Sequence, residues 1–274
     1  MSRAQQLRLP VLVMSLLAVM TALVLASAAG AAPRWAPENR ASIHPGVQTF
    51  TAGAQCTANF VFYDRSDVYI GQAAHCSGSG SSEETNGCLA RSLPLNTKIT
   101  VAGARYPGRL AYNSWVIMRD RTHERDANTC ADNDLALIRL DRRDRGRVNP
   151  TIPRWGGPTG LAYTTREGQD IFTYGNSELR GGITTLSPKR GYSLGTTDGG
   201  WSHTVYTVTP GIPGDSGSAF IDDRGQGFGV LSTVAFAPLT GSNGVGDLRL
   251  ELRYLGRHTR LRVTLARGTR GFHS

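Results

Sequence analysis

The chain of 274 residues is 39% hydrophobic and 19% charged, with a formal net charge of +9. Its length and hydrophobic content suit one large globular domain or two small ones. The 33 glycines and 13 prolines favour many short strands and tight turns, and they argue against an architecture of long helices.

The N-terminal segment has the features of a targeting signal. Two arginines precede an apolar run from Leu9 to about Ala29, which ends in small residues. This pattern predicts a secretory signal peptide over residues 1–31, cleaved after Ala28 or Ala31. The apolar run is also long enough to span a bilayer, so an uncleaved membrane anchor is the alternative. Residues 32–44 are then a short lead-in to the folded domain.

Short β-prone runs bounded by turn residues follow along most of the chain and predict an all-β fold. The predicted strands cover residues 59–63, 68–70, 98–101, 135–140, 170–174, 182–186, 204–208 and 229–234. Between them, the charge-dense residues 141–147 are predicted to form an exposed turn. Residues 148–160, which contain several prolines and glycines, are predicted to link two halves of the fold.

The spacing of hydrophobic residues along the sequence changes near the C-terminus. Leucines recur at helical spacing after Asp247, a good N-cap residue, and predict a helix from about 247 to 257. Alternating apolar residues then predict a final edge strand at 261–265. Residues 247–274 contain seven arginines and only two acidic residues, so residues 258–274 are a basic extension.

This basic extension has two interpretations. A dense positive charge can bind nucleic acid or an anionic envelope. It can equally form a solvated surface, and the lack of interleaved aromatic residues or of a nucleic-acid-binding motif favours that simpler interpretation. We therefore expect no nucleic-acid partner.

Four cysteines lie outside the predicted signal: Cys56, Cys76, Cys88 and Cys130. In an exported protein this even number predicts two disulfides, with three possible connectivities, each worth about 2–4 kcal/mol. The chain has no Cys-x-x-Cys pair, and its six histidines are scattered. We therefore expect no metal site and no cofactor.

Three segments carry residues suited to nucleophilic catalysis. The segment Gly214–Ser218 places Ser216 on a glycine-flanked turn, while His75 and Asp134 lie upstream of it in that order. A serine hydroxyl needs a base to take its proton, and the base needs an acidic partner that fixes its tautomer. The backbone N–H groups of Gly214 and Ser216 would form the oxyanion hole.

With these segments, the chain resembles chymotrypsin-fold (trypsin-like) serine endopeptidases. The matching sequences are Ala73-Ala74-His75-Cys76, Asp134-Leu135-Ala136-Leu137 and Gly214-Asp215-Ser216-Gly217-Ser218, within a resemblance that covers about residues 45–257. The resemblance implies two six-stranded antiparallel β-barrels, at about 45–147 and 161–257, with the site in the cleft between them. It also implies the disulfides Cys56–Cys76 and Cys88–Cys130.

The details resemble the secreted bacterial branch of streptogrisins and α-lytic protease. By this resemblance, Ser232 lies near the catalytic aspartate, and Pro210, Ser232, Thr233 and Val234 belong to the specificity pocket. Basic-specific members carry an acidic residue six positions before the serine, where this chain has Pro210, so a preference for Lys or Arg is not expected. His203 invites comparison with acid-specific relatives, but a structural role on its strand is the favoured interpretation.

The chain departs from the family at its N-terminus. No Ile-Val-Gly-Gly sequence is present, and Ile43-His44-Pro45-Gly46 is a poor substitute. A freed N-terminus beside Asp215 is therefore in doubt, and an internal arginine that the sequence does not identify is the alternative partner. Ser218 also replaces the more common glycine.

These observations predict a secreted, monomeric serine endopeptidase that acts on protein or peptide substrates through His75, Asp134 and Ser216. After removal of the signal, no stable membrane association is expected. The alternatives are a catalytically inactive binding protein on a protease scaffold and a membrane-anchored protease.

Overall fold

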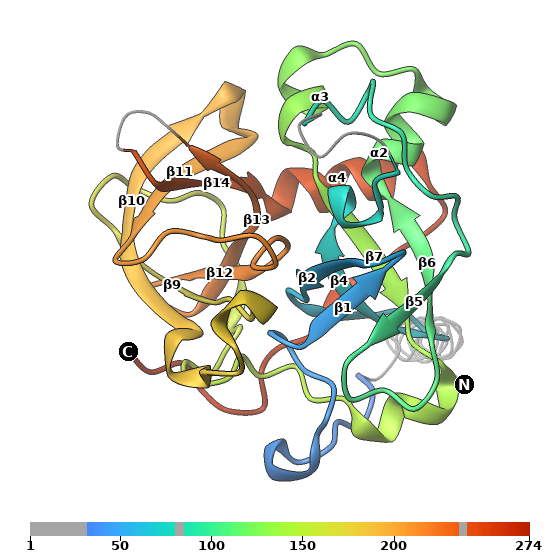
Figure 1. Ribbon diagram of the computed structural model, residues 1–274, viewed down its shortest axis with the longest axis vertical. Coiled ribbons are helices and arrows are strands. Elements are labelled where there is room, and N and C mark those ends of the chain that lie inside the picture. Colours follow the sequence, from blue (N-terminus) through green and yellow to red (C-terminus); the bar gives the residue numbers. More distant parts are fainter. Residues whose placement is uncertain (1–31, 80–84, 236–239) are drawn as a thin grey trace, which may run out of the picture. The chain divides into compact units, whose positions relative to one another are not determined.

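The strands form two curled sheets, one mainly from the N-terminal half of the sequence and one from the C-terminal half, as Figure 1 shows in blue to green and in yellow to orange. The exception is the short C-terminal strand β15, which joins the first sheet. The computed structural model describes residues 32–79, 85–235 and 240–274. Within it, Arg34–Ser274 form one compact unit. The predicted signal peptide at residues 1–31 lies outside the described residues.

The first sheet has eight strands in the order β15-β3-β4-β7-β6-β5-β1-β2. Its strands are β1 (Gln48–Thr51), β2 (Ala54–Thr57), β3 (Val61–Tyr63), β4 (Val68–Ala73), β5 (Lys98–Val101), β6 (Gly108–Asn113), β7 (Leu135–Arg139) and β15 (Thr264–Leu265). All six residues of β4 are buried, whereas β5 alternates exposed and buried residues. The central strands therefore carry the core, and the outer strands present one face to solvent.

The second sheet has seven strands in the order β12-β9-β10-β11-β14-β13-β8, and an additional pairing of β12 with β13 closes six of them into a barrel. Its strands are β8 (Gly160–Leu161), β9 (Asp170–Tyr174), β10 (Pro188–Thr197), β11 (Ser202–Thr207), β12 (Ala219–Asp222), β13 (Gln226–Ala235) and β14 (Ser242–Asp247). Buried aromatic and aliphatic side chains, among them Phe220, Phe228 and Val245, fill this barrel.

The all-β, two-barrel prediction is confirmed, with one correction. The first sheet is a curled half-barrel: among the described residues, no strand pairing joins its end strands β2 and β15. The reason lies at β2, where the N–H of Thr57 donates to the carbonyl of Ser216 in the other half. The edge of β2 is thus used between the two halves.

The helices are short. They are α2 (Ser114–Ile117), α3 (Ala127–Asp132) and α4 (Leu248–His258). The predicted C-terminal helix is confirmed as α4, and the Asp247 carboxylate accepts the N–H of Leu250, as expected of an N-cap. The helices in the described part of the chain are all too short or too polar to span a lipid bilayer.

Two predictions of local structure were wrong in part. Residues 182–186 are not a strand: a 3₁₀ turn occupies Thr184–Leu186, and the strand is the following β10. The preceding Gly181 and Gly182 both have positive φ, which breaks an extended run. At 141–147 a 3₁₀ helix exposes arginines, but Asp144 is fully buried and accepts the N–H groups of Arg105 and Tyr106.

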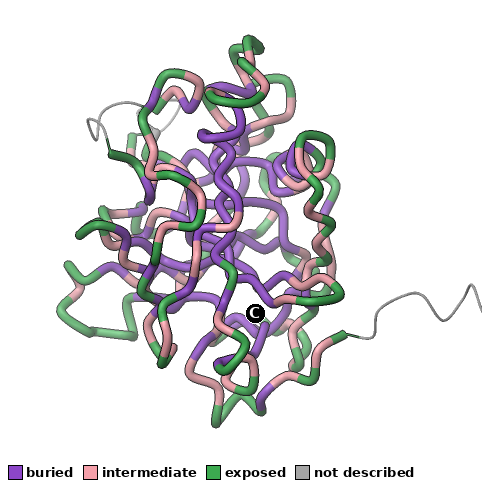
Figure 2. Tube along the Cα trace, turned by 90° about the vertical axis from the view of Figure 1, so that its right-hand side faces the viewer, coloured by how far each residue is buried: buried purple, intermediate pink, exposed green. Residues whose placement is uncertain are grey.

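The basic C-terminal segment is built into the fold. Strand β15 pairs with β3 at the edge of the first sheet, as predicted for a final strand. Further on, the carbonyl of Arg270 accepts the N–H of Gly157, and the Phe272 ring lies 5.1 Å from that of Phe172. The backbone is thus anchored, while exposed residues along it face solvent. For the protein as a whole, Figure 2 shows the buried trace in purple gathered in the interior and the exposed trace in green along the outer loops.

We expect Phe272→Ala to lower the free energy of unfolding by about 2 kcal/mol, because it removes a half-buried aromatic contact on β9. Urea denaturation of the full chain measures this loss. The matched control is Arg267→Ala, an exposed residue of the same segment, which should stay within about 0.5 kcal/mol of the parent. Equal stability of all three proteins would show that the segment does not support the core.

Candidate active site

His75 and Asp134 meet because β4 and β7 are antiparallel neighbours. Ala73 at the end of β4 pairs with Leu135 at the start of β7. His75 lies on a 3₁₀ turn directly after β4, and Asp134 directly precedes β7. The sheet register therefore brings together two residues that are 59 positions apart.

The contact between the two side chains is short and doubly supported. His75 Nδ1 lies 2.6 Å from Asp134 Oδ2, and the backbone N–H of His75 donates to Asp134 Oδ1 at 2.9 Å. A carboxylate at Nδ1 keeps the proton on that nitrogen and leaves Nε2 as an acceptor. Burial lowers the pKa of His75, but the charge and hydrogen bond of Asp134 outweigh it, so the pKa is raised above its ordinary value.

Residues of the C-terminal half hold Asp134 from the other side. A bulge in β13 turns Ser232 out of register, and its hydroxyl donates to Asp134 Oδ2 at 2.6 Å. The backbone N–H of Asp134 donates to Glu251 Oε1 on helix α4 at 3.0 Å. Glu251 is fully buried, and burial raises its pKa well above the ordinary value, which favours the neutral acid.

The turn that carries Ser216 is pressed against the first sheet. A Cβ atom on Gly217 would come within 2.6 Å of the Thr57 carbonyl and 2.7 Å of the Ala73 nitrogen, so only glycine fits there. The Thr57 N–H donates to the Ser216 carbonyl at 2.9 Å, and the Thr57 hydroxyl donates to the Gly214 carbonyl at 2.7 Å. Ser216 therefore lies next to the end of β4. That strand ends at Ala73, two residues before His75.

The Pro213–Gly214 and Asp215–Ser216 peptide groups are oriented by hydrogen bonds to their carbonyls. The Pro213 carbonyl accepts the Ser177 hydroxyl, and the Asp215 carbonyl accepts both the N–H and the hydroxyl of Ser218. In a trans peptide the N–H points opposite to the carbonyl, so the N–H groups of Gly214 and Ser216 face away from these partners. Neither N–H has an acceptor within the described ranges.

Asp215 forms a buried ion pair with two cations from its own half. Arg180 contacts both carboxylate oxygens, and Lys189 Nζ lies 2.7 Å from Oδ2. All three side chains are at most 8% exposed. Burial raises the pKa of Asp215, but hydrogen bonds and charge from Arg180 and Lys189 outweigh it and hold the pKa below its ordinary value. Arg180 is the internal arginine that the sequence did not identify.

The poor candidate for an activating N-terminus, Ile43-His44-Pro45-Gly46, has no hydrogen bond or ion pair to Asp215 among the described residues. Ile43 is fully buried and bridges Val148 in a parallel pairing, inside the continuous chain. Asp215 is thus neutralised by residues of the folded domain.

The residues predicted for the specificity pocket lie in two places. Ser232 is bound to Asp134, while Thr233 and Val234 follow it along β13 and are exposed. β13 pairs with β14 through this stretch, but its pairing with β12 stops at Val230, so one backbone edge of 232–234 has no strand beside it in the described chain. The Pro210 carbonyl accepts Lys189 Nζ at 2.8 Å.

His203 is a buried strand residue, the interpretation that the sequence favoured. Its Nε2 lies 2.9 Å from Asp247 Oδ2, and its Nδ1 lies 3.0 Å from the Thr165 hydroxyl. The ring also packs edge-on against Phe228. With both nitrogens occupied and no exposed surface, this histidine supports the barrel interior.

The only described side chains that cluster like metal ligands are Cys56, Cys76 and His75, and the two sulfurs are joined in a disulfide. The structure also joins Cys88 to Cys130. These are the two pairs that the family resemblance implies. The Cys56–Cys76 bond ties β2 to the turn that carries His75.

Models of protein families give no match to this chain, and no curated protein sequence matches it. Several solved structures match the chain in fold. Thermobifida fusca protease A superposes with a TM-score of 0.54 at 16% identity, over 83% of this chain and 100% of that protein. The chain has the chymotrypsin fold. A glutamic acid-specific serine protease that uses a histidine triad in substrate binding gives 0.53 at 17% identity, over 82% and 100%. The Nocardiopsis protease gives 0.51 at 17% identity, over 82% and 99%.

Several residues that shape the site were missed in the sequence. Arg180, Lys189 and Glu251 carry no local motif, and they reach the site only through the fold. Gln55 is similar: its side chain donates to the Gly214 carbonyl and accepts the N–H of Glu178. The one available signal was the N-cap of α4, which places Glu251 one turn into a predicted helix.

We expect Arg180→Gln to lower the free energy of unfolding by about 3 kcal/mol, because it removes one of the two buried cations that pair with Asp215. The matched control is Arg190→Gln, which breaks the exposed pair with Asp170 and should cost less than about 1 kcal/mol. Urea denaturation measures both. Equal losses would mean that the Asp215 ion pair contributes no more than a surface pair.

Proposed function

We propose that the protein is a secreted serine endopeptidase that hydrolyses peptide bonds through His75, Asp134 and Ser216. The observation that carries the proposal is the buried Asp134 carboxylate bound to His75 Nδ1, with the Ser216 turn pressed against the same strand ends. The likeness to solved serine proteases supports it at the level of the fold.

In the proposed reaction, the Ser216 hydroxyl oxygen attacks the carbonyl carbon of the substrate while His75 Nε2 takes the hydroxyl proton. The resulting imidazolium is stabilised by the Asp134 carboxylate. His75 then gives this proton to the departing amine, and the acyl group remains on Ser216 as an ester. A water molecule attacks the ester with His75 again as the base, which releases the acid and restores the serine.

The backbone N–H groups of Gly214 and Ser216 are proposed to bind the oxyanion of the tetrahedral intermediate. Hydrogen bonds from Ser177 and Ser218 fix the carbonyls of the same two peptide groups. The N–H donors therefore need no rearrangement when negative charge develops on the substrate oxygen. The Asp215 ion pair supports the same turn from inside the second barrel. It would be present without cleavage of the chain at Ile43.

The unpaired edge of β13 at Ser232–Val234 is proposed to hold the substrate as an added strand. Pro210, whose carbonyl is bound to Lys189, would stand at the base of the adjoining specificity pocket. A positive ammonium group lies behind this position, so the pocket should disfavour Lys and Arg side chains. Because His203 is buried, it is not proposed as a ligand for an acidic side chain.

Export is supported by the leader sequence and by the two disulfides, which persist in oxidising compartments. We infer that the mature protein begins after Ala28 or Ala31. Mass spectrometry of the exported protein tests this start. A mature chain that keeps residues 1–28 would favour the membrane-anchored alternative.

A fluorophosphonate should label the exported protein at a single site, because only an activated serine forms the covalent adduct at a useful rate. Ser216→Ala should abolish labelling, and peptide mapping of the parent should place the adduct on Ser216. The matched control is Ser66→Ala, an exposed serine in a turn, which should label like the parent. An adduct on another serine, or none in the folded protein, would favour the inactive binding protein.

The labelling rate should fall as the pH drops through the raised pKa of His75, because only the neutral ring can accept the serine proton. Asp134→Asn removes the charge that raises this pKa, so the fall should move to lower pH. The plateau rate should drop by about 10⁴-fold. Labelling rates between about pH 5 and 9 measure both effects. An unshifted profile in this variant would mean that Asp134 does not act on His75.

A further inference from the structure

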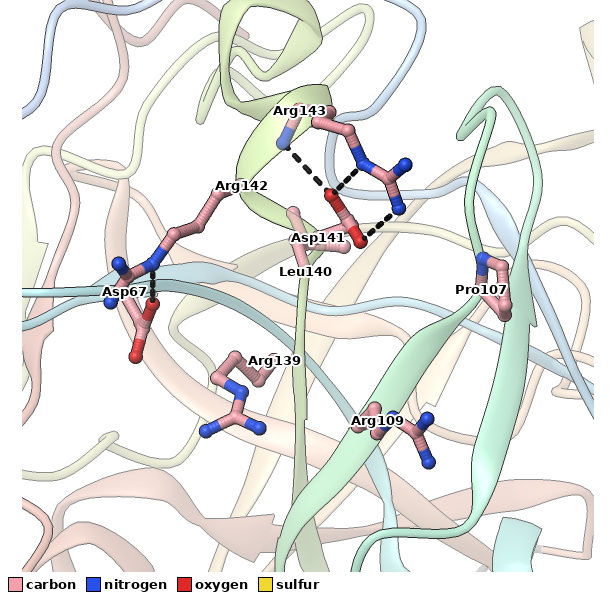
Figure 3. Close-up of a pocket in the computed structure, with 8 residues that line it drawn as sticks. All are labelled: Asp67, Pro107, Arg109, Arg139, Leu140, Asp141, Arg142 and Arg143. Carbon is pink, nitrogen blue, oxygen red and sulfur yellow. Dashed lines mark hydrogen bonds and ion pairs between the residues drawn. The ribbon is translucent and has the colours of Figure 1, made fainter.

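A cavity at the outer face of the first sheet gathers four arginines. Its volume is about 470 Å³, and it is lined by Asp67, Pro107, Arg109, Arg139, Leu140, Asp141, Arg142 and Arg143. Four arginines against two aspartates leave a surplus of two positive charges. Figure 3 shows Arg109 and Arg139 on neighbouring strands, and Arg142 and Arg143 on the segment that follows β7.

Two of the four arginines contact the aspartates of the cavity, although Asp67 is shared with Arg145, which lies 2.9 Å from it. Arg142 Nε lies 3.2 Å from Asp67, and Arg143 makes a two-pronged contact with Asp141 at 2.9 Å (Figure 3). Arg143 also stacks on the Tyr106 ring, with its guanidinium carbon 3.4 Å from the ring centre. These contacts hold the cavity wall in place.

The other two arginines, Arg109 and Arg139, form no ion pair among the described residues. They are direct cross-strand partners in β6 and β7, and Lys98 in β5 is the direct partner of Arg109. The Arg109 side chain donates to the Asn96 carbonyl, and the Arg139 side chain has no hydrogen bond or ion pair in the described part of the chain. Like charges directly opposite each other destabilise a sheet, so this row of three cations has a cost that an anionic ligand would relieve.

We propose that this cavity, the arginine pocket, binds an acidic segment of a polypeptide. The guanidinium groups of Arg109 and Arg139 would take carboxylates in two-pronged contacts, and Leu140 and Pro107 would contact the peptide between them. The two aspartates on the wall, Asp67 and Asp141, oppose a densely charged phosphate backbone. A surplus of two charges fits a pair of carboxylates better than a nucleic acid.

The pocket lies on the same two strands as the catalytic pair, at their opposite ends. Asp67 precedes β4 and Arg139 ends β7, whereas His75 follows β4 and Asp134 precedes β7. At about 3.3 Å per residue, Arg139 lies roughly 17 Å from Asp134 along the strand. An extended chain needs at least about five residues to cover that distance, so the pocket would hold a substrate segment remote from the cleaved bond. This use of the pocket rests on the proposed protease function, whereas peptide binding does not.

The test measures binding alone, on the full chain carrying Ser216→Ala, so it stays separate from catalysis. The probe is a fluorescein-labelled peptide with four glutamates, compared by fluorescence anisotropy with the same peptide carrying four glutamines. We expect the glutamate peptide to bind and the glutamine peptide not to bind. Arg109→Gln and Arg139→Gln should each weaken binding about three- to tenfold, and the double variant more than tenfold.

The matched control is Arg166→Gln, which removes an exposed arginine from the C-terminal half and should change binding less than twofold. The pocket variants should melt at or above the temperature of the parent, because they relieve cross-strand repulsion, so weaker binding would not reflect unfolding. Equal weakening by Arg166→Gln would overturn the proposal in favour of general charge attraction. Displacement by inorganic phosphate at the concentration of the peptide would replace it with a small-anion site, and tighter binding of a DNA duplex would replace it with a nucleic-acid surface. Failure of the peptide to bind would refute it.

Discussion

The Asp134 carboxylate accepts hydrogen bonds from both halves of the molecule, and the arrangement of the site depends on it. His75 donates from the first sheet through its ring and its backbone, and Ser232 donates from the second barrel. A charge that is 1% exposed is costly unless such donors surround it. Any shift of one half against the other would break one of these bonds, so the buried charge fixes the relative position of β7 and β13.

A second buried carboxylate does the same for the turn that carries Ser216. Asp215 carries the Ser216 peptide, and Arg180 and Lys189 hold it inside the second barrel. The carbonyls of Pro213 and Asp215 are held by Ser177 and Ser218. The turn is therefore positioned by ionic contacts from within and by Thr57 from the first sheet. The Ser218 hydroxyl has a defined role at a position where the serine endopeptidases that the chain resembles more often have glycine.

The sequence predicted the parts of the site that depend on short segments. The order of His75, Asp134 and Ser216 and the glycines around the serine were readable because each needs only its own neighbours. The helix from Leu248 was readable from its N-cap and leucine spacing. The ion pairs of Arg180 and Lys189 with Asp215 were not predictable from the sequence, because only the fold brings these cations to a buried carboxylate. The strand predicted at 182–186 failed for a local reason: apolar residues in an exposed 3₁₀ turn resemble a strand when only composition is considered.

The distribution of positive charge separates two uses of arginine that the net charge of +9 does not distinguish. In the C-terminal segment, exposed arginines such as Arg267 stand on a backbone that is anchored by hydrogen bonds, so they act as a solvated face. In the arginine pocket, Arg109 and Arg139 are placed opposite one another across two strands, where like charges repel. That placement lowers the stability of the sheet. We therefore propose an external partner for the arginine pocket and none for the C-terminal segment.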